Sequence, residues 1–481
     1  MATISSTGIG SGLDVNAIVT QLMSIEARPL SLLQQSKSVL DTKLSAIGQL
    51  QSRMSAFRDA ANALSSVSLW KQTVARSANE AAVGVSSSNG TASGSYAVLV
   101  QSLAAAQTVS SRAFTGSGAA LGEGTLTIEL GSWSPEPTPT GFTAKAGGSP
   151  VTITIGPDDT SLASIRDKIN DAGAGVTASI INDASGARLA LRSTETGAEN
   201  AFRVSAAEAV DDGVPGDGLS ALAFSAVGAT QMARSQTAAN ATAQINGIDI
   251  SSASNTLDGV VEGLTLTLRQ VTTAPVEVTV GADTDAVRTA IETFVKSFND
   301  VASYIGTQTK YDAASRKGGT LQGDRMVTSL QSQLRNTITQ SSTASGVFGS
   351  LSEIGIGFKD DGTLELKGSK LDDALGNLPE LNKLFATDGA DTQSSGFADR
   401  FRDLAASILG ADGAFETRND SLKNQITSNT QRQDSMEQRL QKTEARLRAQ
   451  YQALDAQMAQ LSGLSSYLTQ QLAAMSNNYL R

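Results

Sequence analysis

Apolar residues recur at intervals of seven near the C-terminal end of the chain. One track consists of Leu440, Leu447, Leu454, Leu461 and Leu468, with Met475 next in line. A second track runs beside it through Tyr451, Met458 and Leu472. Heptad spacing keeps such side chains on one seam of a helix, and that seam requires a partner. The pattern predicts one long helix from about residue 414 to about residue 477.

The first sixty residues carry a similar stripe. It consists of Leu33, Leu40, Ile47 and Met54, joined by Leu50, Phe57 and Leu64. This stripe predicts a helix from about residue 30 to about residue 64. A shorter helix is expected to start near Asp14, because Ser11 and Asp14 have the spacing of a capping box. It should end before Pro29, since proline disfavours helix in the residue that precedes it.

The region between these ends alternates apolar and polar residues, which predicts β-strands. The clearest alternations lie at residues 97–100, 126–130, 151–155, 189–191, 264–268 and 276–280. One helix is expected at about 162–173, and Asn246-Gly247 predicts a type I′ hairpin turn. Residues 133–150, rich in Pro, Gly and Thr, predict a loop, and residues 206–240 are weakly patterned.

Helical spacing returns at about Thr284 and recurs near 330–338, 369–386 and 396–409, with a hairpin at 354–366. The order predicts an α+β multidomain fold. Both chain ends should build a long antiparallel helical leg bundle, with β-rich head domains inserted between them. The predicted segments are 1–40 (mobile axial helix), 41–72 (leg), 73–125 (head), 126–234 (inserted head domain), 235–283 (head, return part), 284–440 (leg) and 441–481 (coiled-coil axial helix).

The composition excludes several kinds of chemistry. The 481 residues include no Cys and no His, which removes disulfides, thiol nucleophiles, imidazole catalysis and zinc sites built from these residues. A net charge of −10 disfavours nucleic-acid binding. No apolar run approaches the roughly 18 residues of a membrane span, and no cleavable signal peptide is visible. We expect no cofactor, no metal and no catalytic residue.

Two motifs that resemble functional sites have plainer interpretations. The glycines at 8, 10 and 12 resemble a nucleotide-binding loop, but no strand precedes them. Adjacent carboxylates at 158–159, 211–212, 360–361 and 372–373 stand beside turn-forming residues, where aspartate stabilises turns and helix starts. Asp283 and Asp285 are expected to stabilise the start of the helix near 284 in the same way. Catalysis is therefore unsupported.

The heptad seam is the candidate functional feature. Ordinary bundle packing and a self-assembly interface both explain it, and its extension almost to both chain ends favours assembly. The seam consists of Leu33, Leu40, Ile47, Met54, Leu440, Leu447, Tyr451, Leu454, Met458, Leu461, Leu468 and Leu472. We expect residues 1–28 and about 445–481 to be mobile in the free subunit and to become ordered against neighbours.

Three separated segments carry a family resemblance. The opening STGIGSGLDVNAIVTQLMSIEARPL, with LWKQTVARSANEAAVGVSSSNGTASGSYAVLVQSLAAAQT after the first helices, resembles the N-terminal region of the flagellar hook-associated protein 2 family. VTITIGPDDTSLASIRDKINDAGAGVTASIINDASGARLALRSTETG resembles the flagellin-IN module of flagellar axial proteins. FVKSFNDVASYIGTQTKYD, GTLQGDRMV and LSEIGIGFKDDGTLELKGSKLDDAL resemble the family's C-terminal region.

The resemblance implies a structural assembly factor and no enzyme. Family members are secreted through the flagellar type III apparatus and form the distal cap of the bacterial filament, with about five subunits in a closed oligomer. Such a cap retains exported flagellin and promotes its folding and insertion. The implied partners are flagellin, hook–filament junction proteins and an export chaperone before secretion. Some members bind host mucin through the head, a property that nothing in this sequence shows.

Two other functions fit parts of the pattern. A flagellin-like filament or junction subunit shares helical ends, a β-rich middle and the flagellin-IN module, but the segment at 320–409 resembles the cap family. A surface adhesin with a glycan-binding β head is the second alternative. Closed rings distinguish a cap from long filaments of flagellin, and glycan binding without a motility defect would favour an adhesin.

Overall fold

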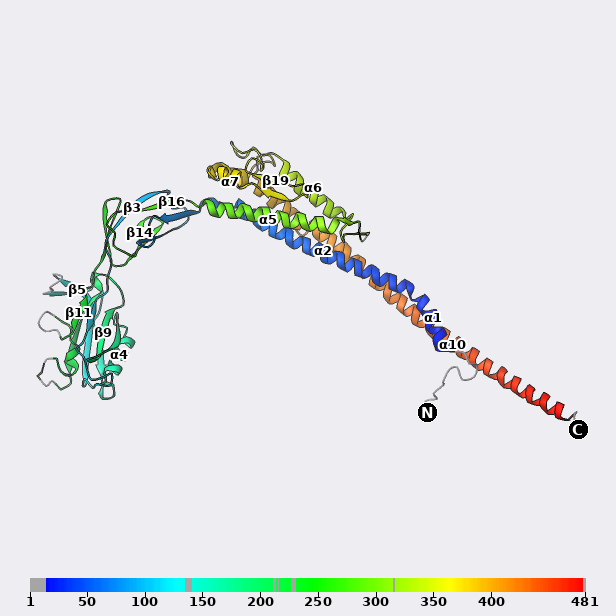
Figure 1. Cartoon of the computed structure of the whole chain (residues 1–481), viewed down its shortest axis with the longest axis horizontal. Coiled ribbons are helices and arrows are strands. Elements are labelled where there is room, and N and C mark those ends of the chain that lie inside the picture. The colour runs from blue at the N-terminus through cyan, green and yellow to red at the C-terminus, as the bar shows by residue number, and fades with distance from the viewer. Residues whose placement is uncertain are drawn as a thin grey trace. The chain divides into compact units, whose positions relative to one another are not determined.

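The chain folds into two units, one built from both of its ends and one inserted between them. The computed structural model describes residues 14–134, 141–210, 213–214, 216–225, 231–314 and 316–478, with side chains up to residue 473 (Figure 1). The helical unit comprises Met1–Leu69 and Thr284–Arg481, and the β unit comprises Trp70–Asp283. The predicted α+β architecture is confirmed.

The helical unit contains long helices from both ends and shorter ones from the C-terminal half. Its helices are α1 (Val15–Glu26), α2 (Arg28–Ser65), α3 (Val67–Trp70, crossing the unit boundary), α5 (Thr284–Thr309), α6 (Arg325–Thr339), α7 (Gly368–Leu375), α8 (Leu378–Ala386), α9 (Phe397–Leu409) and α10 (Ala414–Asn478). Two small hairpins pair β17 (Tyr311–Asp312) with β18 (Lys317–Gly318), and β19 (Ile356–Phe358) with β20 (Leu364–Leu366).

The helix boundaries follow the expected local chemistry. The Asp14 side chain caps α1 by accepting a hydrogen bond from the Ala17 amide at 3.0 Å; Ser11 lies outside the described residues. Ala27 separates α1 from α2, and Pro29 occupies the first turn of α2, where a missing amide costs nothing. The predicted final helix at 414–477 is confirmed by α10, which is 65 residues long.

Aromatic rings hold the thick part of the helical unit together. Phe57 of α2 is fully buried, and its ring centroid lies 5.2 Å from Phe294, 5.7 Å from Phe298 and 5.2 Å from Phe401. These partners belong to α5 and α9, which pack along the C-terminal half of α2. Aromatic pairs in tilted or edge-to-face contact stabilise a core beyond the burial of their area. Through these contacts α2, from the N-terminal part of the chain, is joined to α5 and α9 from its C-terminal half.

Replacing Phe57 by alanine tests this junction. The cavity should lower the free energy of unfolding of the helical unit by about 3–5 kcal/mol. Urea denaturation followed by far-ultraviolet circular dichroism measures the change. The matched control is Val39→Ala on the same helix, because the Val39 side chain is 54% exposed and its loss should cost less than about 0.5 kcal/mol. Equal stability of the two variants would contradict the assignment.

The β unit has a first lobe made of two antiparallel sheets that share one core. The five-stranded sheet has the order β1-β16-β3-β12-β13 and the three-stranded sheet the order β14-β15-β2. Asn246 and Gly247, both at positive φ, form the tip of the β12–β13 hairpin as predicted. The strands are β1 (Thr73–Ser77), β2 (Val83–Ser87), β3 (Gly94–Ser102), β12 (Ala241–Ile245), β13 (Ile248–Ser252), β14 (Thr256–Val261), β15 (Leu264–Leu268) and β16 (Val276–Ala282).

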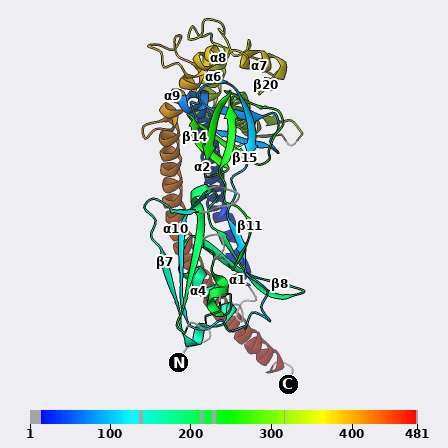
Figure 2. The ribbon, with the colours of Figure 1, turned by 90° about the vertical axis from the view of Figure 1, so that its left-hand side faces the viewer.

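The second lobe is inserted between β3 and β12. Strands β11-β4-β9-β8 form one sheet, and β10, β6 and β7 pair with β5 in another. Helix α4 packs against β8 (Figure 2). The Asn170 side-chain amide exchanges two hydrogen bonds with the Ala178 backbone, at 2.7 and 3.0 Å. The elements are β4 (Thr108–Ser110), β5 (Gly124–Ser134), β6 (Gly141–Ala144), β7 (Val151–Ile155), α4 (Leu162–Asp171), β8 (Val176–Asp183), β9 (Gly186–Ser193), β10 (Ala201–Glu208) and β11 (Ala233–Gln236), with short 3₁₀ turns at Pro157–Asp159, Ala198–Asn200 and Gly218–Leu222.

The predicted loop at 133–150 is wrong in part. β5 continues to Ser134 and β6 pairs with it, while residues 135–140 lie outside the described residues. The reason is burial of Trp133, whose ring lies 4.8 Å from that of Phe142 and whose indole donates to the Phe202 carbonyl at 3.2 Å. This tertiary contact overrides the Pro- and Gly-rich composition.

The second lobe also begins earlier than the sequence indicates. Val109, Phe114 and Leu121 belong to its core, so the expected boundary at residue 126 lies inside the lobe. The weakly patterned stretch 206–240 supplies further core residues, among them Leu219, Leu222, Phe224 and Met232. Their apolar side chains are too widely spaced for a periodic signal, because short turns and single strands carry them.

Candidate assembly surface

Helices α1 and α2 pair with α10 in antiparallel orientation. The Gln51 side chain accepts from Asn419 at 3.2 Å, the Leu33 carbonyl accepts from Gln433 at 3.4 Å, and the Asn16 side chain accepts from Arg448 at 3.0 Å. Residue numbers fall along one partner as they rise along the other. The predicted antiparallel bundle of both chain ends is therefore confirmed.

The structure divides the predicted seam into a packed part and an exposed part. Ile47 and Met54 are fully buried and Leu440 is 9% exposed. Leu33, Leu40, Leu447 and Tyr451 are half-buried. The remaining seam residues are exposed: Leu454, Met458, Leu461, Leu468 and Leu472. The side chain of Met475 lies outside the described residues. A contact of these residues with other subunits stays a prediction.

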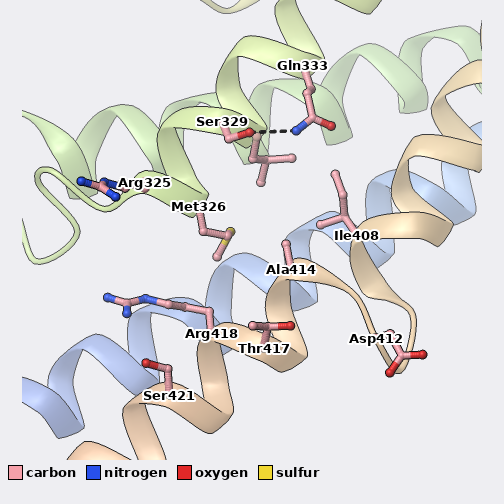
Figure 3. A pocket seen from close by; sticks show the side chains of 11 residues that line it. Arg325, Met326, Ser329, Gln333, Ile408, Asp412, Ala414, Thr417, Arg418 and Ser421 are labelled. Atoms are coloured by element: carbon pink, nitrogen blue, oxygen red, sulfur yellow. Dashed lines mark hydrogen bonds between the residues drawn. The ribbon is translucent and has the colours of Figure 1, made fainter.

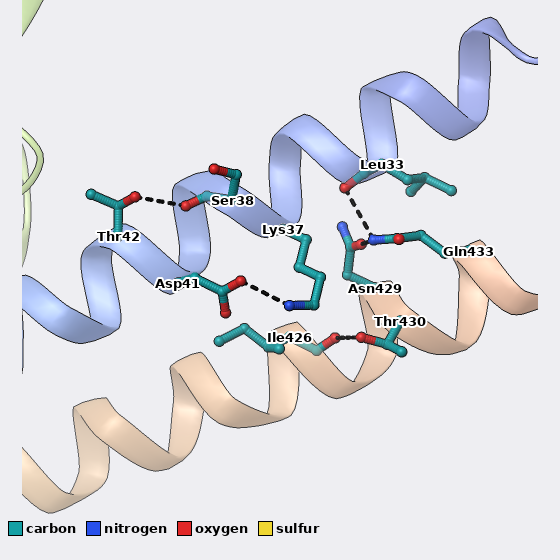
Figure 4. Close-up of polar contacts among 9 residues, drawn as sticks. All are labelled: Leu33, Lys37, Ser38, Asp41, Thr42, Ile426, Asn429, Thr430 and Gln433. Carbon is teal, nitrogen blue, oxygen red and sulfur yellow. Dashed lines mark hydrogen bonds and ion pairs between the residues drawn. The ribbon is translucent and has the colours of Figure 1, made fainter.

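The seam of α10 continues on the N-terminal side of Leu440, where polar residues occupy positions that the apolar heptad pattern did not include. Counting back in sevens from Leu440 leads to Gln433 and Ile426, and Asn429 lies one turn from both. Asn429 is 8% exposed, and its side-chain oxygen accepts from the Gln433 amide at 2.6 Å (Figure 4). The same amide reaches the Leu33 carbonyl. Asn429 and Gln433 were missed because only apolar positions were counted, although the spacing of seven from Leu440 leads to Gln433.

A polar pair inside an apolar seam favours one register at a cost in stability. Gln433→Leu alone should leave the buried Asn429 without its partner and lower the free energy of unfolding by about 1–3 kcal/mol. Asn429→Leu combined with Gln433→Leu should recover at least that loss, because an apolar pair needs no hydrogen bond. A double-mutant cycle in urea measures both effects. A double variant as unstable as Gln433→Leu would contradict this role.

The C-terminal part of α10 extends beyond its described partner. Asn16 lies opposite Arg448, so Asp14, the first described residue, lies opposite about residue 450. α10 continues to Asn478, which at 1.5 Å per residue is about 40 Å further. Its exposed apolar side chains there are Leu454, Met458, Leu461, Leu464, Tyr467, Leu468 and Leu472, which we call the distal stripe. Completing their burial would contribute roughly 5–10 kcal/mol gross.

A cavity of about 540 Å³ lies at the other end of α10, among α6, the end of α9 and the start of α10 (Figure 3). Met326 and Ile408 line it together with Arg325, Arg418 and Asp412. Arg418 pairs with Asp324 at 2.7 Å, and Asp324 also caps α6 through the Met326 amide. The polar groups around this cavity therefore anchor α6 to α10.

The other candidate sites have structural roles. Asp361 lies in the β19–β20 turn, where hydrogen bonds from Thr363 lower the pKa of its carboxyl. Asp158 and Asp159 lie in a 3₁₀ turn, and Asp372 of α7 pairs with Arg288 of α5. Asp211, Asp212 and the glycines at 8–12 lie outside the described residues. Within the described ranges, no group of three or more acidic side chains could hold a metal ion.

The carboxylate of Glu380 likewise belongs to a loop contact. The carboxylate of Glu380 accepts hydrogen bonds from the Lys383 ammonium, the Ser345 hydroxyl and the Gly346 amide, which lower its pKa to about 2. This carboxylate fastens the loop after α6 to α8.

No helix in the described part of the chain has the length and apolarity needed to cross a membrane.

The β unit defines the class of protein. The sequence profile described as the flagellin hook IN motif matches residues 142–195, within the second lobe. The name of this motif, and its place between two pairing helical ends, point to a structural protein of the flagellum as the class.

The particular family follows from the rest of the chain. Profiles for the N-terminus and the C-terminus of flagellar hook-associated protein 2 match residues 11–107 and 238–463. Flagellar hook-associated protein 2 of Escherichia coli strain K12 is 32% identical, over 99% of this chain and 100% of that protein. The B-type protein of Pseudomonas aeruginosa is 30% identical, over 98% of each. The chain belongs to the flagellar hook-associated protein 2 family.

A solved structure supports the same assignment. The D1-D2-D3 domains of the flagellar cap protein FliD from Escherichia coli are 31% identical to this chain and superpose with a TM-score of 0.56. The match covers 79% of this chain and 99% of that one. Most of this chain therefore shares its fold with the named domains of a flagellar cap protein.

Proposed function

We propose that this protein is the distal cap of a bacterial flagellar filament, outside the cell. There it retains exported flagellin and promotes its folding and insertion at the growing tip. Its membership of a family that includes a solved flagellar cap protein supports the proposal. The same names support a structural role, and the proposal is that this role involves no covalent chemistry.

The main support for a reversible assembly contact is the distal stripe of α10. It extends about 40 Å past the described part of the N-terminal arm, so its apolar side chains lack a partner among the described residues. A contact that forms only on assembly can be released and formed again as each flagellin subunit enters. The proposed partners of this contact are neighbouring copies in a closed ring of about five and the flagellin at the filament tip.

The remaining partners follow from the proposed route to the tip. An exported subunit passes through the flagellar type III apparatus and requires an export chaperone before secretion. At the start of filament growth it rests on the hook–filament junction proteins. Host mucin stays outside the proposal, because no described feature of the β unit points to a glycan.

Substitutions in the distal stripe test the proposed function. Leu461→Ser with Leu468→Ser should abolish filament growth in a strain that lacks its own cap protein, because the assembly contact loses its apolar anchors. Filament length by electron microscopy and flagellin released into the medium are the measurements. The subunit itself should keep its thermal midpoint, since both leucines are more than half exposed.

The matched control changes the opposite face of the same helix segment. Ala459→Ser with Gln470→Ser carries two substitutions that lie about 160–180° around the helix from Leu461 and Leu468, and it should support normal growth. If the leucine variant also supports normal growth, the distal stripe is not the assembly contact.

A further inference from the structure

A row of arginines runs along one flank of α10. Arg432, Arg439 and Arg446 are spaced by seven, so they lie within about 40° of one another around the helix. All three are exposed, and none makes an ion pair among the residues that the structure describes. Lys442 lies one turn from Arg439 and Arg446 on the same flank. Like charges at this spacing repel one another, so the row gains stability from an external negative partner.

A row of carboxylates runs along the opposite flank. Asp434 and Glu437 are exposed and have no ion-pair partner in the described part of the chain, while Glu444 accepts from Arg448 at 2.8 Å. Glu437 lies about 160° around the helix from Arg439. The seam that binds α2, at Leu440, lies between the two rows. The two flanks of α10 therefore carry opposite charge on either side of the same contact.

The two rows match in height along the helix. Residues 432 and 434, 439 and 437, and 446 and 444 differ by two positions, which is about 3 Å along the axis. Arginine and glutamate side chains are long enough to span this offset. If two copies stand side by side with parallel α10 helices at equal height, each arginine of one copy faces a carboxylate of the other.

Equal height is the condition that a closed ring imposes on its subunits, because cyclic symmetry allows no rise along the axis. We propose that neighbouring copies of this chain contact each other through these rows, with Arg432, Arg439 and Arg446 of one copy against Asp434, Glu437 and Glu444 of the next. The inference rests on the proposed function for the ring itself. It adds the surface that joins the copies and the direction in which they repeat.

The surface beside the arginine row has room for a neighbour's side chains. A groove of about 550 Å³ lies along this flank, with Leu33 and Met436 among its lining residues next to Arg432 and Arg439. Carboxylate side chains that enter it would place their methylene groups on an apolar floor and their charge against guanidinium groups. Such charge-assisted contacts fix register and orientation as well as adding affinity.

Charge reversal tests the contact on the purified full-length protein. Arg439→Glu should raise the midpoint concentration of oligomer formation at least threefold at low salt, measured by sedimentation velocity. Glu437→Arg should act in the same direction. The double variant carries both reversals and should return to within twofold of the unsubstituted protein, because each interface then regains opposite charges.

Lys423→Glu is the matched control. It makes the same change of net charge on the same helix, but Lys423 pairs with Asp420 of its own copy and lies outside the row. It should assemble normally, and all variants should keep the circular dichroism spectrum of the folded chain. Normal assembly of Arg439→Glu at low salt, or failure of the double variant to recover, would overturn the proposal.

The result also separates this inference from the proposed function. If Arg439→Glu forms normal oligomers but fails to support filament growth, the row binds a different partner at the tip, and the copy–copy contact is wrong while the cap function stands. If the unsubstituted protein forms no closed oligomer under any condition, both proposals fail.

Discussion

The pairing of the N-terminal arm with α10 is the contact on which the rest of the structure depends. It joins residues more than 350 positions apart, such as Gln51 and Asn419, and so closes the chain around the inserted β unit. The aromatic cluster at Phe57 fixes the thick end of this pairing, where α5 and α9 add a second and third partner. Further along, the described residues that contact α10 come from the N-terminal arm, and a polar Asn429–Gln433 contact lies inside the seam.

This gradient from a multi-helix core to a single exposed helix gives the subunit two kinds of surface. The thick end buries its large side chains within the subunit and is expected to stay rigid. The distal stripe of α10 leaves apolar side chains exposed, and its helix is too weakly supported to be stable by propensity alone. A subunit of this kind can exchange contacts at one end without unfolding at the other, which is what insertion of new subunits beneath a cap requires.

Much of the fold was predictable because long periodic segments carry their own signal. The heptads of α10 and the alternation in β15 and β16 are visible without tertiary information. Strand β6 was missed because its pairing depends on the contact between Trp133 and Phe142, which no local pattern records. The sequence also could not show where packing ends along α10. The same leucine spacing runs through Leu440 and Leu461, yet among the described residues the opposing arm covers Leu440 and leaves Leu461 exposed.

We expect the distal part of α10 to become ordered by assembly, whereas the proximal part is ordered by the subunit itself. Amide hydrogen exchange, measured on the free subunit and on the oligomer seated at filament ends, tests this claim directly. We expect residues 415–440 to be protected in both states. Residues 454–472 should exchange rapidly in the free subunit and at least tenfold more slowly in the assembly. Equal protection of residues 454–472 in the two states would contradict the account.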